Sequence, residues 1–465
     1  MEKIRQTLRD HAWARWTALS VVAFTMLTGY YLTDVMAPLK GLLEQQLSWD
    51  SSEYGFFTSA YGWFNVFLFM LIIGGIILDK MGVRFTGLMA AAIMVIGTSI
   101  KFWAVSTHML DGQVWNILWI FQIKAQVFMA ALGYAIFGVG VEVAGITVSK
   151  IIVKWFKGKE LALAMGLEMA TARLGTALAL ATSVPLAKAF GHVSKPILFC
   201  LILLVIGLIS FIIYTFMDKK LDASQAEYDK NNNITNGERA FKISDIFNII
   251  TNRGWWYIAI LCVLFYSAVF PFLKYAADLM VNKFGVDESL AGTIPAMLPF
   301  GTILLTPFFG NIYDRKGKGA TIMLIGSLLL IFVHTMFSIP ILNHWIIAII
   351  LIIILGIGFS LVPSAMWPSV PKIIPENQLG TAYSLIFWVQ NWGLMGVPAL
   401  IGWVLDKYSV TGQKVVEGVT VNTYNYTLPM IIFTSLGILA LVFALLLKVE
   451  DKKKGYGLEL PNIQK

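Results

Sequence analysis

Charged side chains are scarce in this sequence: Asp, Glu, Lys and Arg make up 13% of 465 residues, whereas hydrophobic residues make up 57%. A soluble protein has roughly 25% charged and about 45–50% apolar residues, so a soluble enzyme of two or three domains is excluded. Cys200 and Cys262 are the two cysteines and both lie in apolar runs, so a disulfide framework or cysteine metal site is not expected. No Ser/His/Asp set, phosphate-binding glycine loop or metal-ligand spacing is present. We therefore expect neither an enzyme nor a cofactor or metal.

Long apolar runs account for most of the remaining sequence. A bilayer-spanning helix takes about 20 apolar residues, which leaves room for on the order of twelve such helices. The runs predict helices at about 13–39, 52–78, 85–106, 118–150, 159–188, 195–217, 254–282, 289–313, 319–339, 344–371, 379–405 and 427–448. The first follows a charged segment that lacks a small-residue cleavage site, so we expect it to be retained.

A polar interruption divides these helices into six and six. It runs from Asp218 to Arg253, is rich in asparagine, and ends in the amphipathic segment Phe241–Ile250, which suits a membrane surface. We expect a six-helix bundle at 1–217, a cytoplasmic linker at 218–253, and a second six-helix bundle with a cytoplasmic tail at 254–465.

The basic residues predict the orientation. With both termini in the cytoplasm, 25 of the 35 Lys and Arg residues lie in cytoplasmic segments and seven lie in segments on the other side. This asymmetry fits the preference of basic loops for the cytoplasm. Because the excess charge is spread over every cytoplasmic segment, the net charge of +8 does not indicate a nucleic-acid partner. The three remaining basic residues, Lys124, Arg173 and Lys274, lie inside predicted helices.

The two halves repeat each other. Four local matches occur in the same order, and together they indicate a duplicated six-helix unit. The matching segments are Tyr30–Met36 with Lys274–Met280, Gly75–Arg84 with Gly310–Lys318, Gly138–Gly140 with Gly356–Gly358, and Glu160–Gly175 with Gln378–Gly393. We therefore expect an all-α membrane protein of twelve transmembrane helices in two pseudo-symmetric bundles. Two such halves are typical of a rocker-switch transporter with its site between them.

The segment after the second predicted helix carries a recognisable pattern. It reads Gly-x-x-x-Asp-Lys-x-Gly-x-Arg and resembles the signature of the major facilitator superfamily. Its carboxylate has two possible partners, the end of a neighbouring helix or the arginine of the motif, and either contact would latch one rocking state. The candidate gating residues here and in the repeat are Gly75, Asp79, Arg84, Asp314 and Arg315.

Other stretches resemble one branch of that superfamily, the lysosomal dipeptide transporters. They include Trp155–Leu161, Met169–Gly175 and Gln378–Tyr383, of which the first and the last are fairly specific, and the likeness extends over helices four to eleven. The resemblance implies a transporter that carries dipeptides as a uniporter, and we expect it to be monomeric. It also implies that Glu142 and Arg173 hold the peptide termini. The N-terminus has no acidic dileucine signal, so we expect a plasma or bacterial inner membrane.

The residues themselves suit these roles. Arg173 lies 14 residues beyond Lys159, about 21 Å along a helix, and Glu142 lies eight residues before Lys150, about 12 Å. A guanidinium suits a peptide carboxylate, a carboxylate suits the ammonium, and a dipeptide backbone extends roughly 7 Å between them. The alternative is that Glu142 and Arg173 pair with each other as an interhelical lock.

Further charges have two interpretations each. Lys274 and Asp278 share a helix face and either neutralise each other or leave Lys274 as a second anion anchor. Asp34 occupies the matching place in the first half, as a gate or a substrate contact, and Asp278 is also a candidate gating residue. The remaining candidate substrate contacts are polar or aromatic residues, with helix packing as their alternative: Tyr30, Tyr61, Asn65, Trp367, Trp388, Gln390 and Asn391. We expect His334, in the peripheral ninth helix, to be structural.

A second function fits the same residues. In proton-coupled transport of small organic anions or sugars, Arg173 and Lys274 would anchor the anion and Glu142 would carry the proton. A receptor or scaffold in the same fold would need no complete cavity, and the intact loop motif argues against it.

Overall fold

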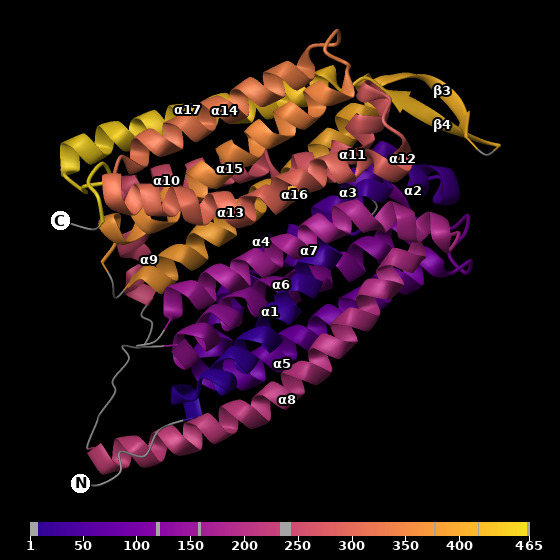
Figure 1. Ribbon diagram of the computed structural model, residues 1–465. Helices are drawn as coiled ribbons and strands as arrows, with labels where there is room; N and C mark the ends of the chain where they lie inside the picture. The colour runs from indigo at the N-terminus through magenta and orange to yellow at the C-terminus, as the bar shows by residue number, and fades with distance from the viewer. Residues whose placement is uncertain are drawn as a thin grey trace.

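The computed structural model describes residues 8–117, 121–156, 160–232, 243–375, 378–416 and 418–462. Two helical bundles lie side by side along their length, one built from the N-terminal half and one from the C-terminal half (Figure 1). The first contains η1 (Leu8–Asp10), α1 (Ala12–Asp34), η2 (Ala37–Leu39), α2 (Lys40–Leu47), α3 (Ser51–Ser59), η3 (Ala60–Gly62), α4 (Trp63–Phe67), α5 (Met70–Ser106), α6 (Ala125–Phe156), α7 (Leu161–Ala189) and α8 (Ser194–Asn232). The second contains α10 (Arg253–Ser267), α11 (Phe270–Phe284), α12 (Glu288–Ala291), α13 (Thr293–Lys316), α14 (Gly319–Ser338), α15 (Trp345–Ile373), α16 (Leu379–Tyr408) and α17 (Thr427–Lys454).

Within the described residues, eleven helices are long and apolar enough to cross a membrane. The second predicted span is missing from that number because it is broken into α3, η3, α4 and the start of α5. Its remainder and the third span are joined in Met70–Ser106, with Gly82 (φ 77°, ψ 172°) marking the kink between them. Counted this way, the chain crosses the membrane twelve times.

The prediction of one continuous helix at 52–78 is wrong. The backbone leaves helical geometry at Phe69, where φ is 54°. A break frees backbone groups that need partners in an apolar setting. Here Trp388 Nε1 donates to the Val66 carbonyl at 3.1 Å, and its ring stacks on Phe69 with centroids 5.5 Å apart. An apolar run cannot reveal such a break, because the partner is supplied by α16 from the other half.

The seventh predicted span, 254–282, is also interrupted. α10 ends at Ser267 and α11 begins at Phe270, with Pro271 in its first turn, where the missing N–H is tolerated. The freed Ala268 carbonyl accepts a hydrogen bond of 2.9 Å from Nε2 of the buried His334. The structural role expected for His334 is therefore confirmed.

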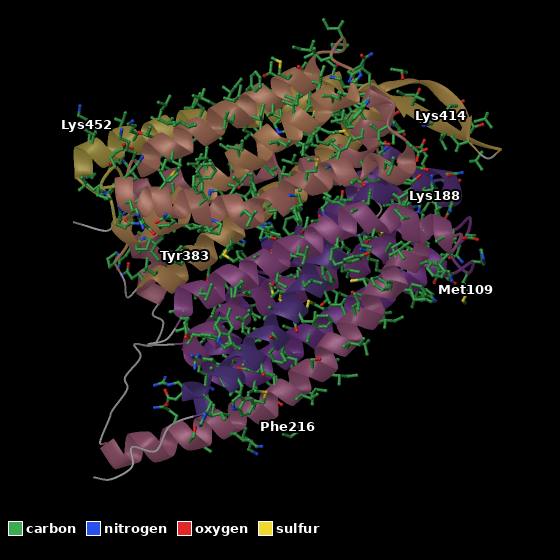
Figure 2. All side chains as sticks on the ribbon, viewed as in Figure 1. Met109, Lys188, Phe216, Tyr383, Lys414 and Lys452 are labelled. Carbon is green, nitrogen blue, oxygen red and sulfur yellow. The ribbon has the colours of Figure 1, made fainter. Side chains whose placement is uncertain are left out.

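Two antiparallel hairpins lie at one end of the molecule and were not predicted. They are β1 (Val114–Ile117) with β2 (Phe121–Lys124), and β3 (Val410–Val416) with β4 (Val419–Tyr424). The expected helix at 118–150 consequently begins at Ala125. We call this the hairpin end, and the opposite end, where both termini lie, the linker end (Figure 1). Figure 2 shows Met109, Lys188 and Lys414 at the hairpin end and Lys452 at the linker end.

The segment between the two bundles contains more helix than the sequence indicates. α8 continues to Asn232, beyond the expected end at 217, and α9 (Ile243–Ile250) coincides with most of the predicted amphipathic segment. Residues 233–242 of the expected linker, and 157–159 of the family stretch at 155–161, lie outside the described residues.

The two halves meet at the hairpin end. Ser52 Oγ donates to Asp406 at 3.0 Å, and Lys188 pairs with Glu288 at 3.1 Å. The backbones of α3 and α16 touch, since a Cβ on Gly402 would lie 2.3 Å from the Ser51 carbonyl oxygen and 2.7 Å from Gly55 Cα.

Glycines near the linker ends of α5, α7, α13 and α16 have no such neighbours. A Cβ added to any of them would have no atom of another element within 4 Å: Gly75, Gly166, Gly310 and Gly380. The ion pair and the close backbone contact described above between the halves therefore lie at the hairpin end.

Candidate functional site

A cavity of about 80 Å³ lies between the two halves. Its lining residues come from α1, α3, η3 and α6 on one side and α11 and α16 on the other: Tyr30, Thr33, Asp34, Thr58, Tyr61, Tyr134, Glu142, Phe270, Pro271, Lys274, Gln390, Leu394 and Pro398. Five of the ten expected substrate contacts, Tyr30, Tyr61, Glu142, Lys274 and Gln390, are among them, together with the expected gating residue Asp34.

Glu142 is half-buried on α6 and faces this cavity. Tyr61 donates a hydrogen bond of 2.7 Å to its carboxylate, and the amide of Asn391 from α16 also lies beside it. Gly138 makes this contact possible, because a Cβ there would lie 2.3 Å from the Tyr61 carbonyl oxygen. Close approach of η3 to α6 thus fixes the carboxylate without a cation.

Arg173 is half-buried on α7 and is surrounded by aromatic rings. Its guanidinium carbon lies 5.3 Å from the ring centroids of Phe270 and Phe359 and 5.9 Å from that of Tyr30. Such cation–π contacts leave the N–H groups of the guanidinium available. Within the described residues Arg173 makes no ion pair, so the lock between Glu142 and Arg173 is absent in this state.

Lys274 is paired across the interface between the halves. Its ammonium donates to Asp34 Oδ1 at 2.7 Å, to the Thr33 carbonyl at 2.5 Å and to the Tyr134 hydroxyl at 3.3 Å. The second oxygen of Asp34 accepts a hydrogen bond of 2.8 Å from Thr176. Asp34 and Lys274 thus form a buried ion pair at the hairpin side of the cavity.

The expected neutralisation of Lys274 by Asp278 is wrong. Asp278 pairs with Lys40 at 3.1 Å and also accepts hydrogen bonds from Asn282 and Tyr426. The two residues share one face of α11, but that face contacts the other half, and each finds an opposite charge there. Spacing within one helix cannot reveal partners on another.

The charged residues of the loop motif also form other ion pairs than expected. Asp79 forms an ion pair of 2.8 Å with Lys150, whereas Arg84 pairs with Asp222 at 3.0 Å. Within the described residues, Asp79 and Arg84 do not contact each other. In the repeat, Asp314 accepts a hydrogen bond of 2.8 Å from Asn462, and Arg315 is exposed. All these contacts stay within one half, so they do not latch the two halves in this state.

Five of the ten expected substrate contacts lie outside the cavity lining. They are Arg173 and four further candidates, each of which has a hydrogen-bond partner in the protein. Trp367 Nε1 donates to the Tyr266 hydroxyl at 3.0 Å, and Trp388 fills the break in the second span. Asn65 donates to the Gly138 carbonyl at 3.3 Å, and Asn391 donates to Phe387 of its own helix at 2.9 Å. Their roles as substrate contacts stay predictions.

Sequence reasoning missed two residues of this region. Tyr134 lines the cavity two turns before Glu142 on α6, and this spacing could have indicated it. Lys101 is one of the seven basic residues that the sequence places on the non-cytoplasmic side, although it falls inside the predicted helix 85–106. In the structure it lies in α5, is 1% exposed, and has its ammonium 4.5 Å from the Tyr134 ring centroid.

The hairpin β3–β4 closes the molecule beyond the cavity. The carboxylate of Glu44 on α2 accepts hydrogen bonds from the Asn422 backbone at 2.7 Å and from the Tyr424 hydroxyl at 3.1 Å. Burial raises the pKa of Tyr424, so its hydroxyl keeps the proton that it donates. The hairpin of one half is thereby fastened to the other half.

Known proteins share this sequence pattern and architecture. Lysosomal dipeptide transporter MFSD1 of Bos taurus is 25% identical over 409 residues, which cover 85% of this chain and 81% of that protein. The Homo sapiens protein of the same name is 26% identical over 404 residues, covering 84% and 80%. A bacterial homologue of the human lysosomal transporter Spinster, in an inward-facing and unoccupied conformation, superimposes with a TM-score of 0.68 at 12% identity, covering 95% of this chain and 98% of that one.

The family model of the Major Facilitator Superfamily matches residues 19–398 and, in a second match, 275–461. The match spans both bundles and agrees with the twelve crossings and the duplicated six-helix unit. The chain is a membrane transporter and belongs to the major facilitator superfamily.

Proposed function

We propose that this transporter carries dipeptides by alternating access between its two halves and functions as a uniporter. The proposal rests on the surroundings of Glu142 and Arg173. Glu142 lines the cavity and is held by a hydroxyl and an amide, whereas Arg173 lies behind the lining, against the rings of Tyr30 and Phe270. Within the described residues the two charges do not pair with each other. A zwitterionic backbone would supply the missing counter-charge to both. The names of the relatives, dipeptide transporters at 25–26% identity, support the same substrate class.

The proposed binding mode follows from these two charges. The peptide carboxylate takes bidentate hydrogen bonds from Arg173, and the peptide ammonium binds Glu142 beside Tyr61. Gln390 faces the same cavity and offers an amide to the peptide bond. Broad acceptance of side chains follows, because the charges recognise the backbone and the aromatic residues around them provide apolar contacts.

The proposed cycle starts from the state in the structure. The linker end, which carries the excess of basic residues, faces the cytoplasm, and the hairpin end is closed. If the hairpin end opened and the linker end closed, the site would face the side of the membrane opposite the cytoplasm. We propose a plasma or bacterial inner membrane, whereas the relatives are named as lysosomal.

Thermal-shift measurements on the purified protein test the substrate class, with dipeptides, amino acids, sugars and dicarboxylates as ligands. Dipeptides should raise the melting temperature of the wild type. They should not do so for Arg173→Ala or Glu142→Gln, although both variants should remain folded. Stabilisation by organic anions without stabilisation by dipeptides would contradict the proposal.

Uniport is tested in proteoliposomes. Labelled dipeptide should equilibrate across the membrane and exchange with unlabelled dipeptide, without accumulation when a pH gradient is imposed. Accumulation driven by the gradient would refute uniport and favour proton coupling.

A further inference from the structure

A buried lysine of the first half has no role in the proposed binding mode. The ammonium of Lys101 lies 4.5 Å from the ring centroid of Tyr134 and 5.2 Å from that of Phe57. Within the described residues it forms no ion pair, and its side chain is almost completely buried. Ring faces compensate a buried positive charge less well than a carboxylate does, so the Lys101 ammonium lacks a full counter-charge among the described residues.

Tyr134 separates Lys101 from the ion pair at the interface. The hydroxyl of Tyr134 lies 3.3 Å from Lys274 Nζ, while the ring face carries Lys101. The charged groups that act on Lys101 are Lys274, which repels its ammonium, and Asp34, which attracts it. Two cations thus compete for the single carboxylate of Asp34, and in this state Lys274 holds it.

The two cations belong to different moving parts. Asp34, Thr176, Tyr134 and Lys101 all lie in the first half, whereas Lys274 lies on α11 of the second half. Opening of the hairpin end withdraws Lys274 from Asp34. The Asp34 carboxylate, which is 4% exposed in the closed state, would then lose the cation that compensates its charge.

We infer that Lys101 is the alternate counter-ion of Asp34. When the hairpin end opens, the Lys101 ammonium leaves the ring face of Tyr134 and pairs with Asp34, so the carboxylate is compensated in both states. The same exchange releases the ammonium of Lys274, which in the open state is available to an anionic group such as a substrate carboxylate. The inference rests on the alternating access of the proposed function but not on the identity of the substrate.

A distance measurement without substrate tests this exchange. Spin labels at Met109→Cys and Lys414→Cys report the opening of the hairpin end, because both side chains are exposed there on different halves (Figure 2). The native Cys200 and Cys262 are buried and should not react with the label. The full-length protein in lipid nanodiscs should show a short and a long distance, for the closed and open hairpin end.

Lys101→Met should reduce the ratio of the open to the closed population by about tenfold. The same substitution in an Asp34→Asn background should have no effect on that ratio, because the carboxylate that needs a counter-ion is gone. Lys101→Arg should retain the exchange. Lys124→Met, a lysine of the same half that pairs with Glu53, is the matched control and should leave the ratio unchanged.

The inference would be overturned by either of two results with folded, monodisperse variants. One is an unchanged ratio in Lys101→Met. The other is an equal effect of Lys101→Met with and without Asp34, which would indicate a purely structural role. Neither result depends on a ligand, so failure of the dipeptide assignment would be seen separately, in the thermal-shift experiment.

Discussion

The contact between α3 and α16 predicts how the conformational equilibrium responds to one methyl group. In Gly402→Ala the new Cβ would lie 2.3 Å from the Ser51 carbonyl oxygen, whereas real Cβ contacts essentially never fall below 3.0 Å. The obstacle is backbone rather than a flexible side chain, so relief requires the two helices to separate. Overpacking of this kind costs about 1–3 kcal/mol.

That cost falls on the state in which the hairpin end is closed. The ratio of open to closed molecules should therefore rise by about 5–150-fold, the factor that corresponds to 1–3 kcal/mol. The spin-label pair at residues 109 and 414 measures the ratio directly. Under conditions in which the closed state predominates, Gly402→Ala should also have a lower melting temperature than the wild type.

Gly396→Ala is the matched control. It lies on the same helix, and a Cβ there would have no atom of another element within 4 Å. The change in helix propensity is the same, so any difference between the variants reports the contact alone. Equal ratios in Gly402→Ala and Gly396→Ala would show that the close packing of α3 and α16 does not set the equilibrium.

Two other substitutions test the site and its surroundings. Tyr61→Phe removes the 2.7 Å hydrogen bond to Glu142 and should weaken dipeptide binding by about threefold to tenfold in a titration, so unchanged affinity would contradict the assigned position of the carboxylate. Lys40→Met leaves the buried Asp278 without its cation and should lower the free energy of unfolding by about 3–5 kcal/mol. The double variant with Asp278→Asn should recover part of this loss in thermal unfolding, and strictly additive losses would contradict the pairing.

The sequence predicts the architecture well because apolar run length and the internal repeat can be read directly from a single sequence. It also selects residues that line the cavity, including Glu142 and Lys274, since charges at bilayer depth are rare. The two helix breaks escape prediction for a physical reason. At Phe69 and at Ala268 the freed carbonyls are satisfied by Trp388 and His334, which come from distant parts of the chain.

The spacing of charged residues along the sequence does not predict their ion-pair partners. Lys274 and Asp278 are suitably spaced for a pair within α11, and Asp79 and Arg84 are close in the chain. The structure gives each of the four a partner on another element. The way in which the helices pack decides which opposite charge lies nearest to a given side chain. A single sequence does not show that packing.

The pair of Lys188 with Glu288 makes closure of the hairpin end partly dependent on salt. Its side chains are 41% and 27% exposed, whereas those of the pair of Lys274 with Asp34 are 11% and 5% exposed. Ions screen charges in contact with water over about 8 Å at physiological ionic strength and act far less on buried ones. A higher ionic strength on the hairpin side therefore weakens the pair of Lys188 with Glu288, whereas the pair of Lys274 with Asp34 keeps its strength. The two ion pairs that hold the hairpin end closed thus respond differently to salt.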